Sequence, residues 1–253
     1  LPMKIFIALR EMGALALASI NSLGFLFSCG ASFYYFRGTE LSRPSKDYGR
    51  KYLSYAFPIA VVDISRTASI NLDRIIIQLF WGPLFVGYYF AAQRIAELLD
   101  YLFKAISQVT FPQMIHYSNR KDYIAMIRLL NKAVFNLIFW LAPIVIIVSF
   151  FSGRIIHLLA GDQFKDSANI LVYLCIWVTL SGVNKLFQNT ILSCGYNVFY
   201  GKVGVLISFV TISLNIFLVP NSIYGIRLPG LGPSGAALSL LLASLLGLVI
   251  NTK

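Results

Sequence analysis

The sequence has few charged residues and few of the residues that usually carry catalytic chemistry. Only 12% of its 253 residues are charged, and it has 3 cysteines and 2 histidines. Cys29, Cys175 and Cys194 stand singly in or beside apolar segments, so neither a disulfide framework nor a thiolate metal site is predicted. His116 and His157 lie far apart and form no zinc-type cluster. We therefore predict no catalytic residue, no metal ion and no cofactor.

Apolar residues, by contrast, are abundant. Hydrophobic residues make up 58% of the chain and its mean hydropathy is +0.74, which is more apolar surface than a soluble core needs. The apolar runs are unbroken, which excludes a membrane barrel of alternating strands. Because a helix needs about 20 residues to cross the hydrocarbon layer, the sequence predicts an all-α integral membrane protein. We expect a polytopic bundle of about seven transmembrane helices, at residues 12–36, 53–80, 84–112, 133–159, 168–194, 202–220 and 233–251.

Acidic residues are scarce, and the basic residues are unevenly distributed. The chain has 10 Asp and Glu against 21 Lys and Arg, a net charge of +11. Thirteen basic residues fall on one side of the predicted membrane, mainly at the N-terminal end and in the connections 37–52 and 119–132, whereas three fall on the other side. Lys and Arg accumulate in cytoplasmic loops, so the basic side is predicted to be cytoplasmic. The charge then fits contact with anionic membrane lipids and requires no nucleic-acid partner.

The basic connection 119–132 alternates charged residues with apolar ones such as Tyr123, Ile127 and Leu130. This pattern is typical of an amphipathic helix lying at the membrane surface. It fits equally well a helical extension of the next span, and the sequence leaves both interpretations open.

Charged and polar residues also lie inside the predicted spans, where they share helix faces. Residues four apart, such as Asp100 and Lys104, and three apart, such as Arg94 and Glu97, are spaced to pair on one helix. A shorter polar patch follows in the fifth span. The polar faces comprise Asp63, Arg66, Thr67, Asn71, Asp73, Arg74 and Gln78 in 53–80, then Gln93, Arg94, Glu97, Asp100, Lys104 and Gln108 in 84–112, then Asn184, Lys185, Gln188 and Asn189 in 168–194.

The energetic cost decides where these side chains point. Nine of them are charged, and at about 2.5 to 3.5 kcal/mol each in contact with lipid they would cost on the order of 25 kcal/mol. Net stabilities are only about 5 to 15 kcal/mol. The charges must therefore face the bundle interior. Two interpretations remain: interhelical salt bridges that fix the helices, or a hydrated and slightly cationic cavity, with five bases against four acids, that accepts an anion.

Three segments, residues 55–95, 158–174 and 213–244, carry an ordered set of features. The set comprises Pro58, Asp73, Gly87, Tyr88, Tyr89, Ala91, Ala92, Gly161, Phe164, Asn215, Pro220, Gly235, Ala236 and Ala237. In order and spacing it resembles the second half of polysaccharide flippases of the Wzx type, in the multidrug/oligosaccharidyl-lipid/polysaccharide exporter superfamily. The resemblance covers roughly residues 50–253.

The resemblance implies a bundle of two six-helix lobes around a central cavity, of which this chain is the C-terminal half. Residues 1–36 would end the first lobe, 37–52 would be the cytoplasmic connection between lobes, and 53–253 would form the six-helix second lobe. The implied function is a flippase in the cytoplasmic (inner) membrane. It would move an undecaprenyl-pyrophosphate-linked oligosaccharide across that membrane for the biosynthesis of O-antigen, capsule or exopolysaccharide.

The resemblance also suggests roles for the inward-facing residues. Arg66, Arg74, Arg94 and Lys185 would bind the pyrophosphate. Asp63 and Asp73 would orient the arginines and bind a coupling ion, either a proton or sodium, and Tyr88, Tyr89 and Gln93 would meet the sugars. The remaining polar residues of the cavity would be Asn71, Glu97, Asp100 and Lys104. Further candidate partners are the polysaccharide polymerase and other proteins of the pathway.

Other functions remain open beside this one. Within the superfamily, the alternatives are a cation-coupled multidrug exporter and a lipid II flippase, and the excess of bases over acids favours an anionic substrate. From another class, the alternative is a membrane-embedded enzyme of polysaccharide synthesis. Such enzymes usually carry a large outer loop rich in Arg or His, whereas the longest outer connection here has about a dozen residues and no histidine. We therefore predict a transporter without enzymatic activity.

The predicted orientation can be tested by labelling. After the native cysteines have been replaced, Asp122→Cys should be shielded from an impermeant thiol reagent added to intact cells, because the connection 119–132 is predicted to be cytoplasmic. Gln163→Cys should react. The reverse labelling pattern would overturn the orientation.

Overall fold

The computed structural model describes residues 14–38, 45–223 and 226–252. The chain divides into two compact units, Leu1–Gly49 and Arg50–Lys253, and each is described by itself. In the first unit, helix α2 (Ala14–Phe36) coincides with the first predicted span. The candidate site lies entirely within the second unit.

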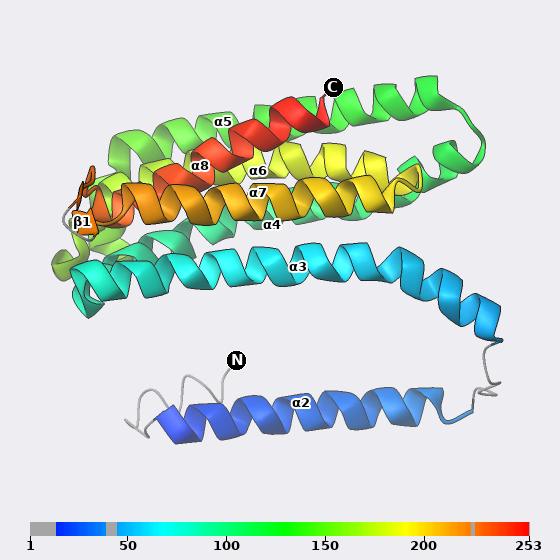
Figure 1. Ribbon diagram of the computed structural model, residues 1–253, viewed down its shortest axis with the longest axis horizontal. Helices are drawn as coiled ribbons and strands as arrows, with labels where there is room; N and C mark the ends of the chain where they lie inside the picture. The colour runs from blue at the N-terminus through cyan, green and yellow to red at the C-terminus, as the bar shows by residue number, and fades with distance from the viewer. Residues whose placement is uncertain (1–13, 39–44, 224–225, 253) are drawn as a thin grey trace. The chain divides into compact units, whose positions relative to one another are not determined.

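Long helices make up nearly all of the described second unit (Figure 1). Each predicted span falls on one helix, so the predicted all-α membrane fold is confirmed. Between α7 and α8 the chain forms a hairpin of two very short antiparallel strands. The elements are α3 (Lys46–Trp81), α4 (Pro83–Asn119), α5 (Tyr123–Ala160), η1 (Asp162–Phe164), α6 (Ser167–Ser193), α7 (Asn197–Leu218), β1 (Ser222–Ile223), β2 (Ile226–Arg227) and α8 (Gly232–Asn251).

Four of the described helices, α5, α6, α7 and α8, are long and apolar enough to cross a membrane by length and composition alone. Helices α3 and α4, with 36 and 37 residues, are also long enough to cross a membrane, but they carry the charged residues noted above. The protein is therefore a multi-pass membrane protein whose charged helices depend on their neighbours to shield those residues from lipid.

Helix α5 decides between the two interpretations of the connection 119–132, a surface helix or an extension of the next span. Asp122 caps the helix by accepting a hydrogen bond from the backbone N–H of Ala125 at 3.0 Å, and from Tyr123 the helix continues without a break to Ala160. Its 38 residues span about 57 Å, nearly twice the hydrocarbon thickness. The basic segment is therefore an extension of the α5 span, as one of the two interpretations held.

Helix α6 is the centre of the second unit and contacts α4, α5, α7 and α8 (Figure 1). Apolar side chains pack around it in two clusters, one toward η1 and one toward the α4–α5 connection. The first cluster includes Ile77, Tyr89, Ile156, Leu171 and Val219, and the second includes Met114, Leu130, Leu137, Leu141 and Leu186.

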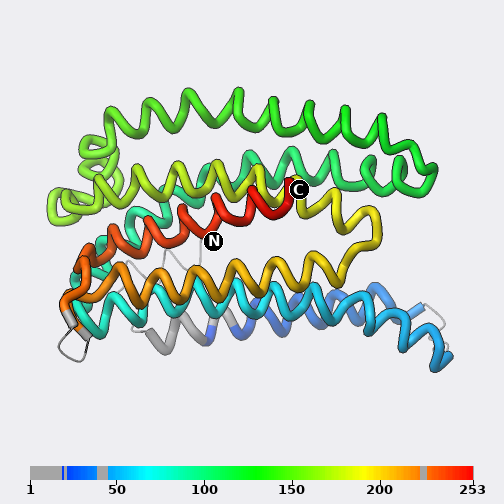
Figure 2. The backbone as a smooth tube through the Cα atoms, turned by 45° about the horizontal axis from the view of Figure 1, so that its top comes forward, coloured from blue at the N-terminus to red at the C-terminus, as the bar shows by residue number. Residues whose placement is uncertain are grey.

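Helices α3 and α7 lie side by side (Figure 2), and glycines bring them close together. A Cβ atom added at Gly204 would lie 2.6 Å from a methyl group of Val62, and one added at Gly201 would lie 2.9 Å from Pro58. Ser69 adds a hydrogen bond across the contact, donating to the carbonyl oxygen of Ser208 at 3.3 Å. This close approach fixes which faces of α3 and α7 point toward the other helices.

Pro58 lies inside α3, which bends in its N-terminal part (Figure 1). Proline has no N–H, so the carbonyl oxygen of Ser54, four residues earlier, loses its helical partner. The side-chain amide of Asn197, at the start of α7, donates to this oxygen at 3.2 Å and to that of Tyr55 at 3.3 Å. A side chain of another helix thus compensates for the break in α3.

The glycine contact yields a stability prediction. Gly204→Ala should lower the free energy of unfolding by about 1 to 3 kcal/mol, the range for overpacking. The reason is that Val62 is buried and β-branched and has no room to move away. Thermal unfolding of the purified protein in detergent measures the change.

Gly153→Ala is the matched control, since Gly153 also lies inside a helix but has open space around its Cβ position. It should be neutral or slightly stabilising, because alanine favours helix more than glycine does. Equal effects of the two substitutions would contradict the close α3–α7 contact.

Candidate functional site

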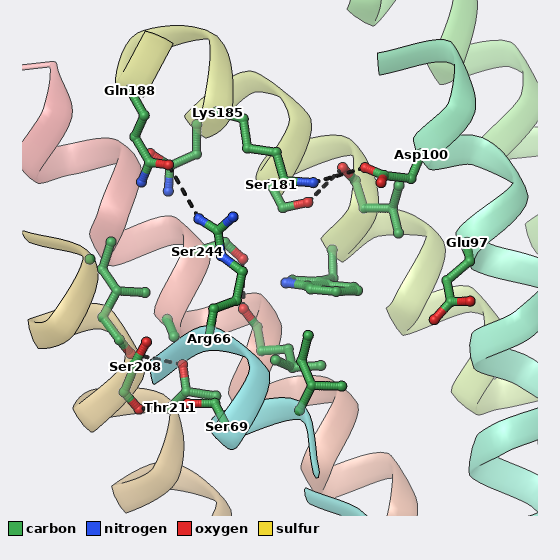
Figure 3. Close-up of a pocket in the computed structure, with 18 of the residues that line it drawn as sticks. Arg66, Ser69, Glu97, Asp100, Ser181, Lys185, Gln188, Ser208, Thr211 and Ser244 are labelled. Carbon is green, nitrogen blue, oxygen red and sulfur yellow. Dashed lines mark hydrogen bonds and ion pairs between the residues drawn. The ribbon is translucent and has the colours of Figure 1, made fainter. Parts of the chain in front are cut away.

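A cavity of about 340 Å³ lies between α3, α4, α6, α7 and α8 (Figure 3). Its lining residues come from the middle of each helix, so the cavity lies at mid-depth of the bundle. Three bases and two acids line it, which leaves a formal excess of one positive charge: Arg66, Lys104, Lys185, Glu97 and Asp100.

Arg66 extends from α3 into the cavity toward α6 (Figure 3). One of its Nη atoms donates a hydrogen bond to Oε1 of Gln188 at 3.4 Å. No carboxylate of the described chain forms an ion pair with it. A guanidinium held by a neutral amide keeps its full charge, and its planar fork suits the oxygens of a phosphate.

Asp100 on α4 links two lysines. Its Oδ1 lies 2.9 Å from Nζ of Lys185 on α6, and its Oδ2 lies 3.4 Å from Nζ of Lys104 on its own helix. The predicted pair of Asp100 and Lys104 is confirmed, and the interhelical partner Lys185 is additional. The Asp100 and Lys185 side chains are 20% and 26% exposed against 56% for Lys104, so the bond between α4 and α6 is the better shielded of the two.

Hydroxyl and amide groups line much of the remaining cavity. Several hydroxyls donate to carbonyl oxygens of their own helix: Ser181 to Val178, Thr211 to Ile207 and Ser244 to Leu240. Their oxygens remain able to accept hydrogen bonds from a ligand. The polar lining consists of Ser69, Gln93, Ser181, Asn184, Gln188, Ser208, Thr211 and Ser244, with Tyr101 and Trp177 as aromatic neighbours.

Two further predicted residues, Arg74 and Arg94, lie outside the cavity lining. The guanidinium carbon of Arg74 lies 5.1 Å from the ring centre of Phe90, and that of Arg94 lies 4.6 Å from it. Arg74 also donates to Oε1 of Gln93 at 3.0 Å, and Arg94 forms the predicted ion pair with Glu97 at 3.0 Å. Gln93 and Glu97 do line the cavity, so each connects one of these arginines to it.

Asp73 also lies away from the cavity, completely buried among α3, α4 and α7. Its Oδ1 accepts a hydrogen bond from the amide of Asn215 at 2.5 Å, and its Oδ2 accepts one from the hydroxyl of Tyr89 at 3.4 Å. It forms no ion pair within the described residues. Tyr89 is fully buried as well, and its neighbour Tyr88 packs edge-on against Phe164.

Asp63 and Asn71 are exposed on the surface of α3 and do not line the cavity. The amide of Asn71 donates to the carbonyl oxygen of Thr67 at 2.9 Å, a bond within its own helix. The polar arc predicted on this helix is wide, and its two edges, Asn71 and Asp73, point in different directions. Of the residues in this arc only Arg66, close to the Asp73 edge, lines the cavity.

The structure thus brings six of the eleven predicted site residues together in one cavity: Arg66, Gln93, Glu97, Asp100, Lys104 and Lys185. Sequence reasoning missed the contributions of α7 and α8. The available signal was a row of small residues at helical spacing, Gly204, Ser208 and Thr211 on α7, together with Ser244 on α8. Such residues are common at any close helix contact in a membrane, so the row does not by itself predict a cavity.

Comparison with known proteins agrees with this architecture. In a comparison with solved structures, the chain matches the crystal structure of a point mutant of a MATE protein, with a TM-score of 0.74 and 14% sequence identity. The match covers 98% of this chain and 57% of that chain, so this chain spans little more than half the length of the MATE protein. At this identity the likeness is one of fold.

The sequence comparisons give the family. A search of curated proteins found no match. The model of a family described as polysaccharide biosynthesis protein matches residues 1–169, which is more than half of the chain. The chain therefore belongs to the polysaccharide biosynthesis protein family, within the exporter superfamily expected from its sequence, and folds as the MATE protein does.

Proposed function

We propose that the whole protein is an exporter that moves an undecaprenyl-pyrophosphate-linked oligosaccharide from the cytoplasmic to the outer leaflet of the cytoplasmic membrane. The exported oligosaccharide would then be used in surface polysaccharide assembly, and the polymerase and other pathway proteins would be partners of the exporter. In this proposal residues 1–36 end a first lobe, 37–52 connect the lobes, and 53–253 form the six-helix transport lobe. No covalent chemistry is required.

The observation that carries the proposal is Arg66, a cation in a polar cavity at mid-depth whose hydrogen-bond partner is an amide. Taking a charge out of water is costly unless it is paired. A binding role explains why this position holds an arginine. The pyrophosphate would accept charge-assisted hydrogen bonds from Arg66, and the hydroxyl and amide groups around it suit the hydroxyls of sugars.

Asp100 supports an anionic substrate in a second way. It pairs with Lys104 and Lys185 at once, so both lysines are held at the cavity wall while its single negative charge compensates only one of their two positive charges. A pyrophosphate group is a better partner for two ammonium groups than one carboxylate is, since it has more charge and more acceptor oxygens. We propose that substrate binding transfers Lys185 from Asp100 to the pyrophosphate, and that Arg74 and Arg94 add positive potential from the rim.

Asp73 is the residue we propose for ion coupling, in preference to Asp63. A proton or a sodium ion needs a carboxylate shielded from bulk water, and Asp73 is completely buried whereas Asp63 is exposed. Its partners come from α4 and α7, so a change in its charge would act on three helices at once.

The alternative of a cation-coupled multidrug exporter fits the cavity less well. An exporter of cations needs available acids, but Glu97 is paired with Arg94 and Asp100 with two lysines. A lipid II flippase would use the same pyrophosphate chemistry and differs only in the glycan.

The pyrophosphate proposal is tested at Arg66. Arg66→Ala should leave the protein folded and inserted but reduce surface glycan about tenfold or more, because a charge-assisted hydrogen bond contributes about 1.5 to 3 kcal/mol. Lipid-linked oligosaccharide should accumulate on the inner leaflet. Arg66→Lys should restore transport only in part, because lysine keeps the charge but loses the planar fork. Protein level and surface glycan are measured in the same cells.

Two further variants control this experiment. Arg128→Ala removes an exposed arginine from α5, outside the cavity, and should leave glycan export unchanged. Arg74→Ala should have a smaller effect than Arg66→Ala, because Arg74 does not line the cavity. Normal glycan export by a well-expressed Arg66→Ala, Arg74→Ala double variant would refute the pyrophosphate role.

The Asp100 pairing is tested by stability. Asp100→Asn should destabilise the purified protein by about 1 to 3 kcal/mol, less than the loss of a fully buried pair, because it leaves Lys185 without a counter-charge. Adding Lys185→Gln should recover more stability than adding Lys104→Gln, since Lys185 is the better shielded lysine. Thermal unfolding of the single and double variants measures this coupling, and strictly additive losses would show that the residues act independently.

A further inference from the structure

A second hollow of the second unit is an apolar groove of about 660 Å³ between α3 and α7. Gly201 forms part of its floor where it meets Pro58. Two phenylalanines on its walls, Phe57 and Phe209, are 69% and 68% exposed. The lining residues are Phe57, Pro58, Val61, Val198, Gly201, Lys202, Val205, Leu206 and Phe209, and lysine is the only charged residue among them.

The groove and the central cavity lie on opposite sides of the α3–α7 contact. On α7 the cavity is lined by Gly204, Ser208 and Thr211, which share one helix face, whereas the groove is lined by Val198, Lys202, Val205 and Phe209. At 100° per residue the two sets point about 120° apart. The groove therefore faces away from the proposed substrate path.

The length of the groove matches one leaflet of a bilayer. Along α7 it extends from Val198 to Phe209, which is about 16 Å at 1.5 Å per residue. Half of the hydrocarbon thickness is about 15 Å. Val198 lies one residue after the start of α7 and Phe209 lies near its middle, so the groove follows the helix through one leaflet only.

The groove has its positive charge at the end near the membrane surface. Lys202 lies on the same face of α7 as Val198 and Val205, and its long side chain can extend toward the headgroups. On α3, Arg50 lies seven residues before Phe57, hence on the same helix face, and it is exposed together with Lys51. This end belongs to the predicted cytoplasmic side, where anionic lipids concentrate.

We propose that this groove binds an anionic phospholipid of the cytoplasmic leaflet. An acyl chain would lie along Val205, Leu206 and Phe209, and the phosphate would lie between Lys202 and Arg50. The apolar walls supply the hydrophobic contact and the two bases supply the preference for negative charge. The bound lipid would cover the side of the α3–α7 contact that faces away from the central cavity.

The same geometry argues against the isoprenoid carrier as the occupant. The headgroup of a carrier must reach the central cavity, and the α3–α7 contact separates that cavity from the groove. A membrane phospholipid has no such requirement, and its chain length matches one leaflet. The proposal therefore does not depend on which substrate the protein exports.

The test uses the full-length protein reconstituted from equal amounts of phosphatidylglycerol and phosphatidylcholine, with retained lipids measured by native mass spectrometry. The wild-type protein should retain phosphatidylglycerol preferentially. Lys202→Gln should reduce that preference about fivefold, the factor that one basic residue contributes near an anionic surface. Val205→Trp, which fills the groove, should abolish retention of the bound lipid.

Matched controls use exposed α5 positions outside the groove. Lys132→Gln and Ile147→Trp should leave the preference unchanged. Benzoylphenylalanine placed at Leu206 should cross-link to phosphatidylglycerol upon illumination. Equal effects of Lys202→Gln and Lys132→Gln would overturn the proposal. So would cross-linking of position 206 to another part of the protein, or to a polyisoprenyl phosphate in membranes that contain one.

Discussion

The constraint on which the rest of the structure depends is the cost of a charge in hydrocarbon. Each charged side chain in the middle of α3, α4 and α6 must find a partner or an aqueous space. Asp100 meets this constraint by joining two lysines, Arg94 and Glu97 by pairing on one helix, and Arg66 and Arg74 by bonding to glutamine amides. The helices pack so that these partners meet, and the central cavity is the space that their polar side chains share.

Close packing by small residues is the complementary device. Gly201 and Gly204 allow α7 to approach α3 closely enough for Ser69 to reach a backbone carbonyl of the neighbouring helix. In a membrane, helices gain little from burying apolar surface against each other, so such contacts and interhelical hydrogen bonds hold the bundle together. The contact also separates the polar cavity from the apolar groove. One pair of helices thus provides two surfaces of opposite character.

Much of the fold could be predicted because it depends on local pattern. The length of the apolar segments predicted the helices, and the spacing of Asp100 and Lys104 predicted that these two residues pair on one helix. The pairings of Asp100 with Lys185 and of Asp73 with Asn215 join residues 85 and 142 positions apart. They depend on the order and rotation of the helices, which a helical wheel does not contain. The same limit explains why the wide polar arc of α3 divides in the structure among the cavity, a buried cluster and an exposed face.

The amide of Asn197 has a consequence for how α3 can move. At Pro58 the helix lacks an internal hydrogen bond, and the freed carbonyl oxygen is held from outside by this one amide. Bending α3 at this point therefore breaks an interhelical contact and leaves the rest of the helix ladder intact. How easily α3 bends at Pro58 thus depends on Asn197, a residue about 140 positions away in the sequence. The flexibility of α3 at Pro58 therefore depends on a side chain of α7. A substitution at Asn197 would change this flexibility without any change in the sequence of α3.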